Sequence, residues 1–195
     1  MAIKPILFNT EMVRAILDGR KVCTRRVIKH NVGAILNSPY HMEHPEVEDA
    51  WLIKKLCRPP YEPGDILYVR ETWCGLPVNE AGHFRGHPIY YYKADGDLRP
   101  EGWRGAWHPS IHMPKEAARI WLKVTDVRVE RLQDMTDDDA EAEGCFDYSS
   151  TALGFFDVWD STIKKSDRDR YGWTANPWVW VIQFERCGKP EEVRR

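Results

Sequence analysis

The sequence lacks the features that define several large classes of proteins. No apolar run is long enough to span a membrane, and the opening residues (MAIKP) are not followed by the apolar segment of a secretory signal. There is no Gly-rich phosphate loop and no regular alternation of strands and helices, which argues against a doubly wound nucleotide-binding fold. Neither sign of charge is in excess, since 28 Lys and Arg face 30 Asp and Glu for a formal charge of -2. Any nucleic-acid site must therefore be a local basic patch.

Cysteine pairs of the C-x-x-C type are also absent, and the number of cysteines, 5, is odd. Together with the missing signal, this favours a reducing, cytoplasmic setting with free thiols. His108 and His112 are four residues apart, a spacing that can hold a metal on a helix, but neighbouring prolines favour a loop here. We therefore predict no metal, no organic cofactor and no contact with a membrane.

What the sequence does contain is a dense basic segment directly after a short helical pattern. Residues 19–26 read GRKVCTRR and combine Lys and Arg with the hydroxyl of Thr24 and the thiol of Cys23. A Thr hydroxyl needs an adjacent base to act as a nucleophile, and a neutral Lys21 is a candidate for that base. In a regular strand positions 21 and 24 point to opposite faces, so the two can cooperate only if the chain bends. The alternatives are a solvent-exposed basic strand and, for Cys23, either an activated thiol or an apolar filler.

Further candidate residues are spread along the chain. Glu143 ends a short acidic helix and could carry a proton. Glu71 ends a strand and belongs either to a site or to a buried network with Arg25 or Arg26. The 9 Trp residues could include a platform for stacking bases, although most are expected in the core. Contacts to a substrate or a phosphate are expected from Arg25, Arg26, Glu71, Trp73 and Asn176.

The pattern of apolar residues predicts an α+β domain. The expected elements are strands over residues 5–8, 66–73, 89–93, 118–129 and 178–184, and helices over residues 10–18, 136–143 and 155–163. A slip in the apolar phase predicts a β-bulge near residues 125–126. A small curved sheet or barrel with helices at its rim fits this order best.

The predicted domain covers residues 1–187 and is followed by a flexible tail over residues 188–195. Residues from about 30 to 60 show no clear period and are interpreted as an irregular excursion. Residues from about 74 to 117, rich in Gly, His, Pro and Trp, are interpreted as a second long loop insertion.

The order of these motifs resembles the ASCH family. The resemblance rests on the GRKxxTRR run after a helix, the Pro-Gly-Asp turn at residues 63–65 before a strand, the stretch over residues 132–144, and the closing WVWVIQF strand. The chain looks especially like the longer ASCH proteins of phages and prophages, from whose compact relatives it departs by its two insertions. The resemblance implies a β-barrel similar to the PUA domain, with a cleft that can hold a nucleoside or RNA.

The resemblance also implies a chemistry. A compact bacterial ASCH protein removes the acetyl group from N4-acetylcytidine, and its proposed catalytic residues match Lys21, Thr24 and Glu143. The leading hypothesis is therefore an amidohydrolase that acts on an N4-acylated cytidine-like nucleoside. The alternative is a module that binds RNA or single-stranded DNA, possibly with ribonuclease activity, since other ASCH proteins are regarded as RNA-binding modules or ribonucleases. Fold resemblance alone does not decide between these activities.

Overall fold

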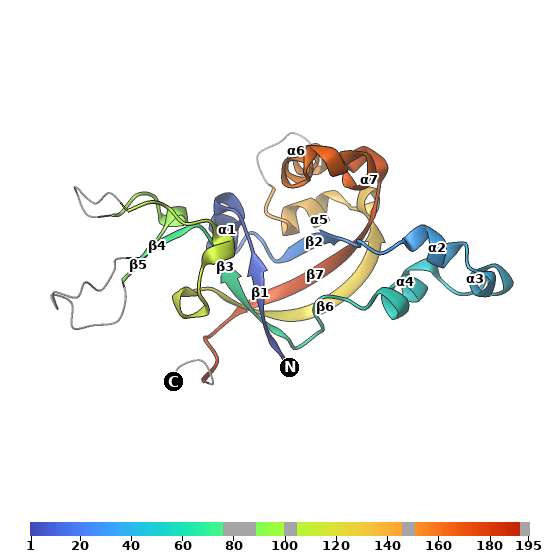
Figure 1. The fold of residues 1–195 in the computed structure, drawn as a ribbon, viewed down its shortest axis with the longest axis horizontal. Helices are drawn as coiled ribbons and strands as arrows, with labels where there is room; N and C mark the ends of the chain where they lie inside the picture. The colour runs from blue at the N-terminus through green and yellow to red at the C-terminus, as the bar shows by residue number, and fades with distance from the viewer. Residues whose placement is uncertain (76–88, 100–104, 146–150, 192–195) are drawn as a thin grey trace.

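Figure 1 shows the computed structural model of the chain, which describes residues 1–75, 89–99, 105–145 and 151–191. The strands are β1 (Ile3–Leu7), β2 (Cys23–Val27), β3 (Ile66–Arg70), β4 (Trp73–Gly75), β5 (Tyr90–Tyr92), β6 (Trp121–Arg131) and β7 (Trp178–Cys187). The α-helices are α1 (Thr10–Leu17), α2 (Val32–Leu36), α3 (Pro39–Glu43), α4 (Asp49–Cys57), α5 (Asp137–Ala142), α6 (Thr151–Thr162) and α7 (Arg168–Tyr171). Short 3-10 turns are η1 (Lys93–Asp95), η2 (Ser110–His112), η3 (Lys115–Ala117), η4 (Leu132–Asp134), η5 (Lys165–Asp167) and η6 (Trp173–Ala175).

The main sheet has five strands in the order β1-β3-β6-β7-β2, and the predicted α+β class is confirmed. β1 runs parallel to β3, and the other neighbours in this sheet are antiparallel. The sheet is curved but not closed into a barrel, because β1 and β2 form its two edges and no ladder joins them in the described residues. The expectation of a barrel is corrected to an open, curved sheet.

The two longest strands, β6 and β7, form the middle of the sheet and carry its curvature (Figure 1). Their register shifts between Val124 and Asp126, which confirms the predicted bulge. The shift moves the buried positions from Leu122 and Val124 to Val127 and Val129, so the apolar side chains stay inside as the strand bends.

The prediction of an irregular excursion over residues 30–60 is wrong. This segment contains the three helices α2, α3 and α4, which lie together beyond one end of the sheet (Figure 1). Asn31 caps α2, and Ser38 caps α3 with Pro39 following it. Asn and Ser are preferred N-cap residues, and Pro is common in the first turn of a helix. With only five residues each, however, α2 and α3 are too short to show a helical period in the sequence. Ile53 and Cys57 of α4 are buried in the main core.

The second expected insertion contains the two-stranded β4-β5 sheet and the turns η1 to η3, and residues 76–88 and 100–104 of it lie outside the described residues. The main core lies between the sheet, α1 and α4. A second cluster packs β2 and β7 against α5 and α6, with Cys23, Leu132, Phe155 and Val181 among its members. In the described part of the chain, no helix combines the length and the apolar character needed to cross a bilayer.

Candidate functional site

Lys21 is positioned by the end of α1 rather than by a strand. Asn9 caps the start of this helix by accepting a hydrogen bond from Met12 N at 2.9 Å. Gly19 ends it with a φ of 78°, a left-handed conformation that glycine adopts without strain. Lys21 N then donates to Ala15 O at 3.0 Å, and β2 begins two residues later. Lys21 therefore lies in the turn between α1 and β2, directly before the strand that carries Thr24 and Arg25.

Glu143 is positioned by the end of α5. Thr136 and Asp139 form a capping box at the start of this helix, and Glu143 is its C-cap residue. Gly144 follows with a φ of 91°. A Cβ at Gly144 would lie 2.8 Å from Ala15 Cβ and 3.2 Å from Lys21 Cβ, so the end of α5 packs directly against the turn after α1. Val22 N also donates to Ala142 O at 2.8 Å.

This packing brings Lys21 and Glu143 together across 122 residues of sequence. Lys21 Nζ donates to the Glu143 carbonyl oxygen at 3.0 Å and also contacts Oε2 of the Glu143 carboxylate. The Lys21 side chain is 0% exposed and that of Glu143 is 3% exposed. A solvent-exposed basic strand is therefore excluded, and the two residues form a buried ion pair.

Arg25 joins this pair from β2. Its guanidinium lies 3.5 Å from a Glu143 carboxylate oxygen, 3.2 Å from Asp139 and 3.4 Å from Glu130, and its side chain is 0% exposed. Arg128 contacts Glu130 and Asp139 from β6, which is separated from β2 by β7. Together these residues form three cations and three carboxylates around a buried centre, and we call the set the buried charge cluster: Lys21, Arg25, Arg128, Glu130, Asp139 and Glu143. Lys21, Arg25 and Glu143 are its buried members, whereas the other three side chains are partly exposed.

The pKa values of both Arg25 and Cys23 are raised in this cluster, so Arg25 stays charged and Cys23 stays a thiol. Burial by itself lowers the pKa of Arg25, but Glu143, Cys23 and Asp139 outweigh it and the net shift of this pKa is upward. Burial and the charge of Glu143 raise the pKa of Cys23 to about 12, against the opposing effect of Arg25 and Lys21. Cys23 is therefore a buried apolar filler rather than an activated thiol.

Thr24 lies on β2 opposite Ile182 and is 3% exposed. By alternation it shares a face with Arg26, whereas Cys23 and Arg25 point to the other face. No hydrogen bond joins Thr24 to Lys21 or Glu143 within the described residues. The Phe8 ring lies near both Lys21 and Arg26: its centroid is 5.6 Å from Lys21 Nζ and 5.3 Å from Arg26 Cζ.

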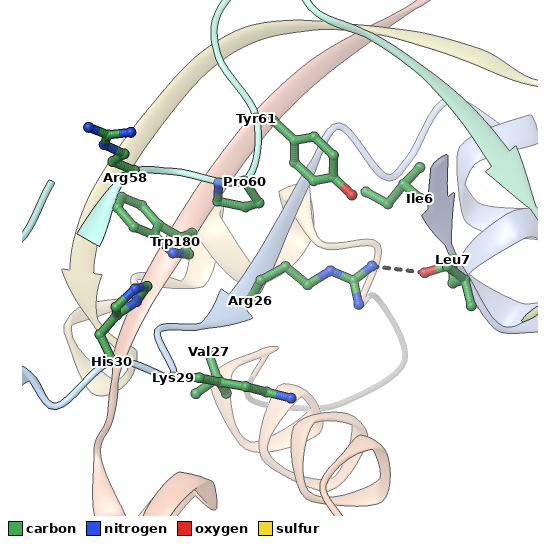
Figure 2. Close-up of a pocket in the computed structure, with 10 residues that line it drawn as sticks. All are labelled: Ile6, Leu7, Arg26, Val27, Lys29, His30, Arg58, Pro60, Tyr61 and Trp180. Carbon is green, nitrogen blue, oxygen red and sulfur yellow. Dashed lines mark hydrogen bonds between the residues drawn. The ribbon is translucent and has the colours of Figure 1, made fainter. Parts of the chain in front are cut away.

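A pocket of about 390 Å³ opens between the edge strands β1 and β2 (Figure 2). Arg26 crosses it and donates from Nη2 to Leu7 O of β1 at 2.8 Å. Tyr61 donates from its hydroxyl to Pro5 O, also on β1, at 2.8 Å. Four basic side chains and two aromatic rings line this edge pocket, namely Arg26, Lys29, His30, Arg58, Tyr61 and Trp180. None of its described lining residues is Asp or Glu.

A second, smaller pocket of about 260 Å³ lies between α1 and α6. Glu143, Gly144 and Cys145 line it together with apolar side chains such as Met12 and Phe155. Glu143 thus borders a cavity that shares no lining residue with the edge pocket.

The remaining predicted contact residues lie elsewhere. Glu71 is 1% exposed and pairs with Arg119, at 2.9 Å, not with Arg25 or Arg26. Trp73 packs on the rings of Tyr90 and His108 beside the two-stranded sheet.

Asn176 adopts a left-handed φ of 44° before β7, and its side chain accepts a hydrogen bond from Gln133 N at 2.9 Å. Asn tolerates this conformation, so the residue shapes the turn into the strand. The structure therefore brings Lys21, Arg25 and Glu143 together and places Glu71, Trp73 and Asn176 in separate structural contacts.

The sequence interpretation missed the carboxylates Glu130 and Asp139 as partners of Arg25, and it missed most of the edge pocket. The signal for Asp139 was present in the capping box, which fixes its carboxylate at the start of α5. Lys29 and His30 continue the basic segment, but Arg58 lies in the segment predicted to be irregular and Tyr61 directly follows it. Among the described residues, no group of three His, Cys, Asp or Glu is arranged to hold a metal ion.

No family model matches the sequence, and no curated protein matches it. The structure is similar to a crystal structure of an ASCH domain from Lactobacillus crispatus, with a TM-score of 0.47 and 10% sequence identity. The alignment covers 95% of this chain and 79% of that chain. At 10% identity most side chains differ between the two proteins, so the chemistry of the present site rests on the contacts of its own residues.

Proposed function

We propose that the protein is an ASCH-type amidohydrolase that removes the acyl group from an N4-acylated cytidine-like nucleoside. The observation that carries the proposal is the buried contact between Lys21 Nζ and the Glu143 carboxylate. An amine and a carboxylate in contact are one proton transfer away from a neutral amine and a carboxylic acid. These are the base and the acid that hydrolysis of an amide requires.

In the proposed reaction, a proton moves from Lys21 Nζ to Glu143 and leaves the amine neutral. The amine takes the proton of the Thr24 hydroxyl as Thr24 Oγ1 attacks the acyl carbon. The bond from that carbon to the exocyclic nitrogen breaks, and Glu143 gives its proton to this nitrogen. Glu143 then takes a proton from water, and the hydroxide attacks the ester on Thr24 and releases the carboxylic acid. Lys21 Nζ returns a proton to Thr24 Oγ1, and the proton on Glu143 passes back to Lys21, which restores the starting ion pair.

Arg25 acts in this scheme as a positioning residue. Because it is held by Glu130 and Asp139 as well as by Glu143, it keeps the Glu143 carboxylate oriented toward Lys21 without contacting the substrate. Thr24 is buried and does not line the edge pocket, but it alternates onto the face of β2 that carries Arg26, so the proposed path of the nucleoside to Thr24 runs from the edge pocket.

The test is turnover of a panel of N4-acylated cytidines by the wild-type protein and by variants. Thr24→Val keeps the shape of the side chain and removes the nucleophile, so hydrolysis should fall by at least a hundredfold. Glu143→Gln and Lys21→Met should act similarly, with folding checked by circular dichroism. Matched controls are Glu141→Gln, an exposed residue of the same helix, and Lys165→Met, an exposed lysine far along the chain. Absence of wild-type turnover, or full activity of Thr24→Val, would contradict the proposal.

A module that binds RNA or single-stranded DNA is the second candidate, favoured by the basic lining of the edge pocket. It predicts binding of labelled oligonucleotides without hydrolysis of any acylated cytidine, and an affinity that falls as salt rises. Failure to bind at low salt would exclude it.

A further inference from the structure

We propose that the edge pocket binds a nucleoside through a phosphate group, so that the ligand is a phosphorylated nucleoside in which Arg26 and Lys29 hold the phosphate and Tyr61 contacts the base. This inference rests on the proposed function for the reaction that follows binding, and it names the substrate class more closely. The binding step itself is testable without any hydrolysis.

The cations of the edge pocket have no carboxylate partner among the described residues. Arg26, Lys29 and Arg58 form no ion pair with any described residue, although Asp and Glu slightly outnumber Lys and Arg in the chain. Arg25, one residue before Arg26, is by contrast in contact with three carboxylates. Cations gathered in a concave site without carboxylates favour an anionic ligand.

The Arg26 guanidinium has hydrogen-bond donors to spare. It makes one hydrogen bond in the described structure, to Leu7 O, and a guanidinium carries five N–H donors. Burial lowers the pKa of Arg26 from its ordinary value, against the opposing effect of Tyr61 and Glu143, because nearby water is scarce and no carboxylate is in contact. The free donors are suited to the oxygens of a phosphate, which Arg binds through two parallel hydrogen bonds.

A further argument is the arrangement of the walls. Figure 2 shows the Arg26 side chain crossing the pocket, with the Tyr61 ring on one side and the Lys29 amine on the other. Tyr61 is half-buried and anchored to Pro5 O by its hydroxyl, so its ring is held in place for stacking on a base. The volume of about 390 Å³ lies within the range of pockets for small ligands.

Phe8 lies between the edge pocket and Lys21, one of the residues of the proposed reaction. Phe8 is in contact range of both Arg26 and Lys21, so a ligand anchored at Arg26 lies on the face of β2 from which Thr24 is approached.

The test measures binding by calorimetry at low salt with the full chain and with ligands that carry no acyl group. The probes are cytidine, cytidine 5′-monophosphate, inorganic phosphate and a short oligocytidylate. We expect the monophosphate or the oligocytidylate to bind at least tenfold more tightly than cytidine, and the tighter of the two identifies a free nucleotide or a strand as the source of the phosphate. Arg26→Met and Lys29→Met should each weaken this binding about tenfold or more, as expected for a lost hydrogen bond between charged groups.

Lys29 is exposed, so Lys29→Met leaves the fold intact, and Lys165→Met is the control with the same change of charge. Tyr61→Leu should weaken the nucleotide severalfold and leave inorganic phosphate unaffected. Equal affinity for cytidine and its monophosphate, unchanged binding in Lys29→Met, or inorganic phosphate binding as tightly as the nucleotide would each overturn the inference. Because none of these ligands is a substrate for deacylation, the result is independent of whether the hydrolysis is observed.

Discussion

Arg25 and Arg26 are neighbours in sequence and lie on opposite faces of β2 in opposite electrical surroundings. Arg25 is enclosed by Glu130, Asp139 and Glu143, whereas Arg26 donates to the carbonyl of Leu7 and faces a pocket lined by further cations. The strand thus separates a cation that neutralises the protein's own carboxylates from one that is available to a ligand.

Replacing these two arginines should affect stability very differently. Arg25→Met removes a buried cation from three carboxylates and should lower the free energy of unfolding by about 3–5 kcal/mol. Arg26→Met removes one hydrogen bond to a backbone carbonyl and should cost about 1 kcal/mol. Urea unfolding of the two variants measures the difference, and equal losses would contradict the assignment of Arg25 to the buried charge cluster.

Gly144→Ala should disturb the contact between the end of α5 and the turn after α1. The left-handed φ costs an alanine about 1–2 kcal/mol, and the new Cβ, 2.8 Å from Ala15 Cβ, adds a steric cost. Gly19→Ala is the matched control, because its φ is also left-handed and nothing lies within 4 Å of the new Cβ. Thermal or urea unfolding should show a loss at Gly144 that exceeds the loss at Gly19 by roughly 1–3 kcal/mol.

The raised pKa of Cys23 predicts a loss of stability at alkaline pH. Its pKa is raised from 9.0 to about 12 in the folded protein, so above pH 9 the unfolded chain releases this proton while the folded protein retains it. Its contribution to stability is therefore complete below the unfolded pKa and declines as the pH rises toward the folded pKa. The free energy of unfolding of the wild type should fall more steeply above pH 9 than that of Cys23→Ala, and parallel curves would contradict the prediction.

Arg119→Met should produce a defect that depends on pH. Burial raises the pKa of Glu71 from 4.5 although Arg119 opposes this shift, so removing Arg119 raises the pKa of Glu71 further. The variant must then bury an unpaired carboxylate at neutral pH, and its deficit should shrink as the pH falls and Glu71 becomes protonated. Unfolding curves of wild type and variant at several pH values measure this, and a deficit that does not change with pH would show that Glu71 is not responsible.

Most of the strands and the bulge could be predicted from the sequence because their signals are local. The exception is β2, whose cations hide the apolar alternation of a buried strand. The alternation of Leu122 and Val124 and its slip to Val127 record the bulge directly. The contact of Lys21 with Glu143 has no such local signal, since 122 residues separate them and the contact depends on how α5 packs against the turn after α1. The resemblance to ASCH proteins, not the residue pattern, suggested that pair.

The edge pocket could not be predicted for a related reason. Arg58 and Tyr61 reach it only because α4 returns the chain toward β1, and short helices leave little periodicity in a sequence. The partner of Glu71 could not be predicted either. Arg119 precedes β6 and Glu71 follows β3, so the two meet only through the pairing of these strands.

The position of β2 in the sheet has a consequence for protein synthesis. In the described sheet β2 pairs with β7 alone, and β7 follows the other four strands of this sheet in the sequence. A chain still growing on the ribosome has made the basic segment early but lacks the strand that holds it until residues 178–187 have emerged. Nascent or truncated chains that lack β7 therefore carry Arg25 and Arg26 without the strand pairing that places them on opposite faces, and the site forms only after β7 has been synthesised.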